Sequence, residues 1–250
     1  MDELIHAAAR AERLLVVSDF DGTLAEFSTD IYNVPVNEDA LAALHKLAGL
    51  PDTAVAILSG RHLEGLLQVM PLRSPVIIGA SHGAETLGQS TAPTEKMLTF
   101  LDQVSAQLHE LTKKYPGTFV EEKPFQRGFH TLALSQRDPQ LAKKALADAR
   151  QIPHDGFFQK DAKNIVEFSA SPATKGSWIE AQRDLLGATA VVFLGDDVTD
   201  EDGFQVLCGK DDISVKVGPG ETAAKLRLPD IAAVAEFLSK LADARQASVA

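Results

Sequence analysis

The sequence is poor in cysteine, in long apolar runs and in positive charge. Its single cysteine, Cys208, excludes a disulfide within the chain and a zinc site built from cysteines. No segment reaches the ~20 apolar residues of a membrane span, and the charged stretch 1–14 lacks the apolar region of a signal peptide. Asp and Glu number 35 against 24 Lys and Arg, which gives a net charge of −11. We therefore expect a soluble cytoplasmic protein that binds neither nucleic acid nor a membrane.

Short apolar runs alternate with helical patterns through much of the chain. The predicted strands cover residues 14–20, 53–60, 74–80, 189–197 and 212–218. Each of these runs is apolar almost throughout, as in strands that are buried on both faces. Apolar residues at helical spacing predict helices over 37–50 and 61–70. The alternation indicates an α/β fold, a Rossmann-like core with a doubly wound parallel sheet.

The middle of the chain follows a different pattern. The predicted elements are a long amphipathic helix over 94–115, strands over 117–125 and 128–135, a helix over 138–150, and a hairpin over 156–170 that turns near 160–163. This αββαββ order is typical of an α+β domain rather than of a parallel sheet. We therefore expect a core domain made of residues 1–85 and 170–250, and a second domain, residues 86–169, inserted into it.

Polar side chains close several of the predicted strands. Asp19 and Asp21 follow the first strand, Ser59 follows the second, Lys175 begins a helix, and Asp196 follows a later strand. Ligands of such sheets bind outside the carboxyl ends of the strands. Carboxylates, a hydroxyl and a lysine gathered at one edge are suited to phosphoryl transfer. A carboxylate can attack phosphorus and form an aspartyl phosphate.

Each of these residues can be given a role in such a reaction. We predict that Asp19 attacks phosphorus and that Asp21 acts as general acid and base. Mg²⁺ prefers oxygen ligands, and Asp19, Asp196 and the backbone carbonyl of Asp21 would hold it. Ser59 and Lys175 would bind the remaining phosphoryl oxygens.

Four stretches of the chain resemble the motifs of the haloacid-dehalogenase (HAD) phosphohydrolases. The stretch DFDGTL is similar to the first motif, and Ser59, Lys175 and GDDVTDE fall where the second, third and fourth motifs are expected. In the last of these, we expect Asp197 and Asp200 to lie behind the ligands and orient water on the metal. The inserted segment has the place of the cap domain that follows the second motif.

Further stretches resemble the trehalose-6-phosphate phosphatase family within this superfamily. They are SGR (59–61), HGAE (82–85), EEK (121–123), His130, VEF (166–168), TKG (174–176) and GDDVTDEDGF (195–204). The resemblance implies that the cap residues Glu121, Lys123 and Glu167 bind the sugar. It also implies substrate contacts at Gly60, Arg61 and His130.

At one position the chain departs from the family, and this leaves more than one sugar phosphate possible as the substrate. The family often has His-Tyr-Arg in the second cap strand, where this chain has His130-Thr131-Leu132. Sucrose phosphate, mannosyl-3-phosphoglycerate and other sugar phosphates therefore stay possible substrates, and a catalytically silent sugar-phosphate sensor is a further alternative. We expect a monomer that acts on a small sugar phosphate.

Overall fold

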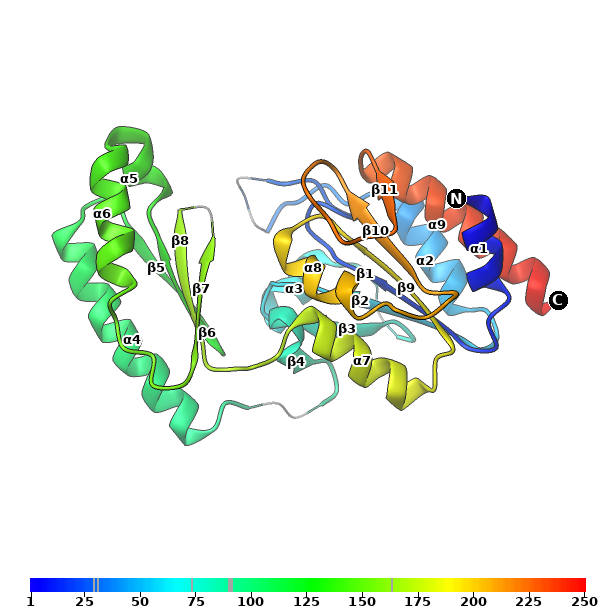
Figure 1. Cartoon of the computed structure of the whole chain (residues 1–250), viewed down its shortest axis with the longest axis horizontal. Helices are drawn as coiled ribbons and strands as arrows, with labels where there is room; N and C mark the ends of the chain where they lie inside the picture. Colours follow the sequence, from blue (N-terminus) through cyan, green and yellow to red (C-terminus); the bar gives the residue numbers. More distant parts are fainter. Residues whose placement is uncertain (29, 31, 73, 90–91, 163) are drawn as a thin grey trace. The chain divides into compact units, whose positions relative to one another are not determined.

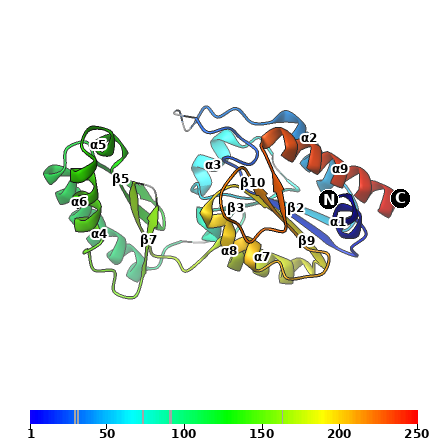
Figure 2. The same cartoon turned by 45° about the horizontal axis from the view of Figure 1, so that its top comes forward.

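The computed structural model describes residues 1–28, 30, 32–72, 74–89, 92–162 and 164–250. The chain divides into two compact units, which are drawn in Figures 1 and 2. The first unit consists of Met1–Gln89 and Ala173–Ala250, and the second of Ser90–Pro172. These limits lie a few residues later than those expected from the sequence, because Thr86 pairs with Gly79 in the sheet of the first unit.

The first unit contains a seven-stranded sheet with the order β11-β10-β9-β1-β2-β3-β4. Its strands are β1 (Leu14–Ser18), β2 (Thr53–Leu58), β3 (Ile77–Ala80), β4 (Glu85–Thr86), β9 (Ala190–Gly195), β10 (Ile213–Val217) and β11 (Leu226–Leu228). All neighbouring pairs are parallel except β3 and β4. The predicted parallel α/β core is confirmed.

Helices cover both faces of this sheet. They are α1 (Asp2–Ala9), α2 (Glu38–Ala48), α3 (Leu63–Val69), α7 (Lys175–Leu186), α8 (Glu201–Gln205) and α9 (Ile231–Val249). Leu14 and Val16 of β1 pack in the hydrophobic cluster that includes α1, α2 and α9, whereas Leu15 and Val17 pack with α7 and α8. Figure 2 shows these two groups of helices on opposite faces of the sheet. Burial on both faces explains why β1 is apolar at successive positions.

The second unit is a four-stranded antiparallel sheet with helices on one face. Its elements are α4 (Glu95–Lys114), β5 (Phe119–Lys123), β6 (Gln126–His130), α5 (Leu132–Arg137), α6 (Pro139–Ala149), β7 (Phe158–Ala162) and β8 (Ile165–Ser169). The strand order is β5-β6-β8-β7. Phe129 and Phe168 of the sheet pack in one cluster with Phe100 and Leu108 of α4. The predicted hairpin is confirmed as β7 and β8; Lys163, at its turn, lies outside the described residues.

The strand predicted over 128–135 is wrong in its second half. The strand ends at His130, and residues Leu132–Arg137 form helix α5. Leu134 is buried in the core of the unit while Leu132 is exposed. A run this short fits a helical period and a strand period equally well, so the sequence pattern did not distinguish them.

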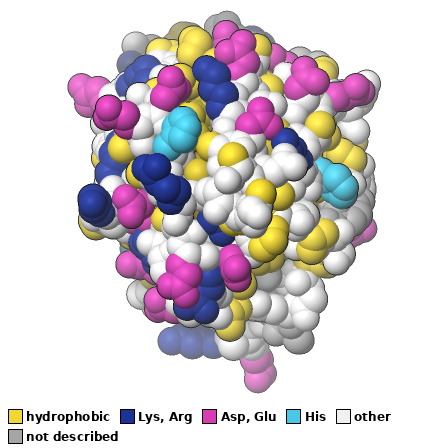
Figure 3. Space-filling view, turned by 90° about the vertical axis from the view of Figure 1, so that its right-hand side faces the viewer, with side chains coloured by type: hydrophobic (Ala, Val, Ile, Leu, Met, Phe, Trp, Pro, Cys, Tyr) yellow, Lys and Arg dark blue, Asp and Glu magenta, His cyan; other side chains and the backbone are white. Residues whose placement is uncertain are grey.

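The distribution of charge and the apolarity of the helices can be compared with what the composition predicts. On the face drawn in Figure 3, acidic and basic side chains are intermingled, so the excess negative charge is not gathered there. No helix among the described residues has the length and apolarity that crossing a bilayer requires.

Candidate active site

The carboxyl ends of β1 and β9 bring together the first group of predicted residues. Asp19 directly follows β1, Asp196 directly follows β9, and the Asp19 amide donates to the carbonyl of Leu194 at 2.9 Å. The register of the two strands, Ser18 beside Leu194, places the residues after them side by side. The parallel pairing therefore delivers both carboxylates to the same edge.

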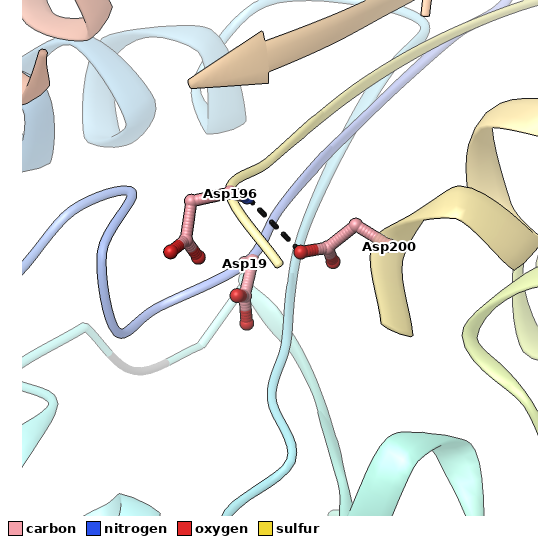
Figure 4. A group of neighbouring side chains, drawn as sticks. All are labelled: Asp19, Asp196 and Asp200. Carbon is pink, nitrogen blue, oxygen red and sulfur yellow. Dashed lines mark hydrogen bonds between the residues drawn. The ribbon is translucent and has the colours of Figure 1, made fainter. Parts of the chain in front are cut away.

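Three carboxylates meet at this edge, as Figure 4 shows. Asp19, Asp196 and Asp200 each contribute an oxygen, and these oxygens all lie within 4.8 Å of one another. Asp200, which the sequence predicts behind the metal ligands, supplies the third carboxylate of the group. Its Oδ2 accepts hydrogen bonds from the amides of Asp196 and Asp197, at 3.0 and 2.9 Å. Asp200 therefore also holds the turn that presents Asp196.

Lys175 is the cation nearest to two of these carboxylates. It is the first residue of α7, which begins with a capping box between Thr174 and Ser177. Its Nζ lies 3.0 Å from Asp19 Oδ1 and 2.6 Å from Asp200 Oδ1, and its side chain is 2 % exposed. Burial alone would lower the pKa of Lys175, but the two carboxylates raise it well above its ordinary value. Lys175 is therefore a permanent positive charge in this site.

One lysine does not balance three carboxylates. Burial raises the pKa of Asp19 well above its ordinary value, and the charges of Asp200 and Asp196 raise it further against the opposing effect of Lys175. Burial and the neighbouring carboxylates likewise raise the pKa of Asp196 to about 6. A divalent cation would relieve this repulsion, and oxygen ligands of this kind suit Mg²⁺. The donor set therefore fits the predicted metal.

Two residues that the sequence motifs do not mark support the turn that presents Asp196. Gly22 has φ +75°, and a Cβ at this position would overlap the Asp196 carboxylate. The buried Lys216 of β10 donates to the backbone carbonyl of Asp196. Gly22 belongs to the DFDGTL stretch, where a glycine directly after the second of two aspartates is a signal of such a turn. No local signal marks Lys216.

The turn after β2 places Ser59, Gly60 and Arg61. Ser59 is buried, and its Oγ accepts a hydrogen bond from the Arg61 amide at 3.1 Å. A Cβ at Gly60 would lie 2.5 Å from Cε1 of His82, so a larger residue there would require this ring to move. The Arg61 guanidinium forms two hydrogen bonds of 2.7 Å with the carboxylate of Asp21. The predicted acid and base of the reaction is therefore bound to the arginine of the second motif.

The predicted sugar-binding residues lie in the second unit, on the face of its sheet away from the helices. Glu121 pairs with Gly128, and Gly128 pairs with Glu167, so the two glutamates lie in one row across three strands. Glu121 Oε2 lies 3.1 Å from His130 Nε2 and 3.4 Å from Lys123 Nζ. The hydrogen bond from His130, together with the charge of Lys123, lowers the pKa of Glu121 to about 2. The face thus holds an ionised carboxylate beside two potential donors.

The chain is similar to trehalose phosphatases by all three comparisons. The family model described as "Trehalose-phosphatase" matches residues 17–231. A trehalose-6-phosphate phosphatase of Escherichia coli is 33% identical over 91% of this chain and 86% of its own length. Among solved structures, the C-terminal domain of a C. albicans trehalose-6-phosphate phosphatase matches with a TM-score of 0.74 and 22% identity, over 96% of each chain.

The same fold is found in a protein with a different description. The C-terminal domain of a Candida albicans trehalose synthase regulatory protein matches with a TM-score of 0.71 and 15% identity, over 92% of this chain and 93% of that one. Likeness at this level shows the fold alone. Which chemistry the site performs depends on the side chains described above.

Proposed function

This chain belongs to the trehalose-phosphatase family, and we propose that it is a Mg²⁺-dependent phosphatase that hydrolyses trehalose 6-phosphate to trehalose and phosphate. The observation that supports this most strongly is the buried Lys175, which contacts Asp19 and Asp200 at the carboxyl end of the parallel sheet. Gathering a buried lysine and three carboxylates in one place costs folding free energy, and clusters of this kind are found chiefly at functional sites.

The reaction proceeds in two steps. The Asp19 carboxylate attacks phosphorus, the bond from phosphorus to the sugar oxygen breaks, and Asp21 gives a proton to that oxygen. Asp21 then takes a proton from water, which attacks phosphorus and frees Asp19. Ser59 and Lys175 bind phosphoryl oxygens throughout.

Asp19, Asp196 and the carbonyl of Asp21 would hold the Mg²⁺, with Asp197 and Asp200 supporting this turn. When bound, the cation supplies the charge that lets an anionic carboxylate meet an anionic phosphoryl group. Lys175 contributes the same kind of neutralisation from the protein itself.

We assign the second unit the role of a cap that selects the sugar, with Glu121, Lys123, His130 and Glu167 as its contacts. A disaccharide offers many hydroxyl groups, which carboxylates accept from and a lysine donates to. A wrong sugar would leave these groups without partners, which is costly. Gly60 stays a predicted contact of the phosphoryl group. We propose that the enzyme works as a monomer, since one chain supplies every proposed residue, and that it is cytoplasmic.

A phosphate-release assay tests this function. Trehalose 6-phosphate, sucrose phosphate, mannosyl-3-phosphoglycerate and glucose 6-phosphate are compared with Mg²⁺ and with excess chelator. We expect the highest kcat/KM for trehalose 6-phosphate, and no turnover under chelation. A higher kcat/KM for another sugar phosphate would make that compound the substrate in place of trehalose 6-phosphate. Saturable binding without phosphate release from any of them would indicate the silent sensor.

A further inference from the structure

The side chains of Arg61 and Asp21 form a paired contact beside the catalytic carboxylates. Nε of Arg61 donates to Asp21 Oδ2 and Nη2 donates to Oδ1, each at 2.7 Å. A guanidinium that binds both oxygens of a carboxylate fixes its direction as well as its distance. Asp21 follows β1 and Arg61 follows β2, which are adjacent in the sheet.

Arg61 is itself held in place from several sides. Its amide donates to Ser59 Oγ, its carbonyl accepts from the amide of Ser81 at 2.7 Å, and its guanidinium lies 5.8 Å from the centre of the Phe20 ring. Ser81 and His82 have φ values of 49° and 55°, which residues other than glycine seldom adopt. Strained backbone of this kind is found where a site needs a fixed geometry. The arginine is therefore organised before any substrate arrives.

We infer that Arg61 is a positioning residue for Asp21, rather than chiefly a contact of the substrate. The inference depends on the proposed function for the role of Asp21 as general acid. When Asp21 takes a proton from solvent, the oxygen that carries it no longer accepts from Arg61 and can give the proton to the leaving oxygen. The hydrogen bond from Arg61 to the second oxygen keeps the acid directed at that leaving oxygen. Without Arg61 the carboxylate rotates freely and is correctly placed for only part of the time.

Two roles of Arg61, binding the phosphoryl group or positioning Asp21, predict different rates for a series of phosphate esters when the arginine is removed. Every phosphate ester carries the same phosphoryl group, so a lost phosphate contact slows all esters alike. Help from an acid depends on the leaving group, because nitrophenolate leaves without a proton whereas phenolate and alkoxides need one. Loss of Arg61 should therefore slow an ester more strongly as its leaving group becomes poorer.

The test uses Arg61→Met and Arg61→Lys on a series of aryl phosphates from 4-nitrophenyl to phenyl phosphate. We expect Arg61→Met to lower kcat/KM, which reports the steps up to release of the phenol, at least ~10-fold for phenyl phosphate and no more than ~2-fold for 4-nitrophenyl phosphate. Arg61→Lys, which keeps the charge but has one donor nitrogen in place of the two that bind Asp21, should fall between the wild type and Arg61→Met. Thermal unfolding of both variants reports whether they fold.

The double variant, in which Arg61→Met is added to Asp21→Asn, provides the control. If Arg61 acts through Asp21, adding Arg61→Met to Asp21→Asn should cause little further loss. Equal losses of kcat/KM along the aryl series, or full additivity with Asp21→Asn, would overturn the inference. The aryl series contains no sugar, so a failure of the wild type on trehalose 6-phosphate would refute the substrate assignment separately.

Discussion

Asp19 and Asp200 share Lys175, but the rest of their surroundings differ. The pKa of Asp19 is raised because burial opposes its charge, so the folded protein favours a neutral side chain there. Asp200 accepts hydrogen bonds from two backbone amides in addition to Lys175. Substitution of Asp200 should therefore cost more stability than substitution of Asp19.

We predict that Asp19→Asn abolishes turnover without lowering the melting temperature measured in chelator. Asparagine keeps the shape and removes a charge that the fold does not favour. Asp200→Ala should instead lower the free energy of unfolding by ~3–5 kcal/mol, because Lys175 and two amides lose an acceptor. Thermal and denaturant unfolding of both variants measure this contrast. Equal destabilisation by the two changes would refute it.

Among the elements, α9 provides a stabilising contact far from the site. Arg245, 1% exposed, donates to the carbonyls of Ala9, Ala11, Pro51 and Asp52. These carbonyls precede β1 and β2, at the end of the sheet opposite to the carboxyl ends. The contact therefore ties the C-terminal helix to the segments that enter the two central strands.

We predict that Arg245→Met lowers the free energy of unfolding by ~2–4 kcal/mol, because it removes four hydrogen bonds that a buried, charged donor makes to the backbone. The kcat at a temperature where the variant is folded should stay near that of the wild type. Lys240→Met, an exposed change on the same helix, is the matched control and should be close to neutral. A similar loss in both variants would show that the Arg245 hydrogen bonds add no stability.

The elements differ in how far their sequences predict them. The buried strands are predictable because successive apolar residues need two covered faces, as in β1. Helix α5 and the short β4 and β11 are not, because a few residues carry no resolvable period. In the site, the motif residues directly after strands are predictable from their position. The contacts of Arg61 with Asp21 and of Lys216 with Asp196 join residues far apart in sequence, and no local pattern encodes them.

At the scale of the whole molecule, each unit has its own task. In the proposed mechanism, the carboxylates and Lys175 of the first unit act on the phosphoryl group, which all sugar phosphates share. Choice of sugar must then come from elsewhere, and the glutamate row of the second unit is the proposed source.

We predict that Glu121→Ala or Glu167→Ala lowers kcat/KM for trehalose 6-phosphate at least ~10-fold, or about 1.4 kcal/mol. Turnover of 4-nitrophenyl phosphate, which offers no sugar hydroxyls, should hardly change. Glu122→Ala is the control, because Glu122 is the next residue of β5 and bonds to Ser105 of α4. Equal losses on both substrates would mean that the two glutamates support the fold rather than sugar choice.

The claim on which the whole account depends is that Asp19 carries the phosphoryl group. Asp21→Asn should accept it from 4-nitrophenyl phosphate, whose leaving group needs no acid, but should release it slowly for lack of a base. Mass spectrometry after an acid quench, followed by peptide mapping, measures this directly. The account predicts one added phosphoryl group on Asp19 in Asp21→Asn and none when Asp19→Asn is added. Steady turnover with an unmodified chain, or the phosphoryl group on another residue, would contradict it.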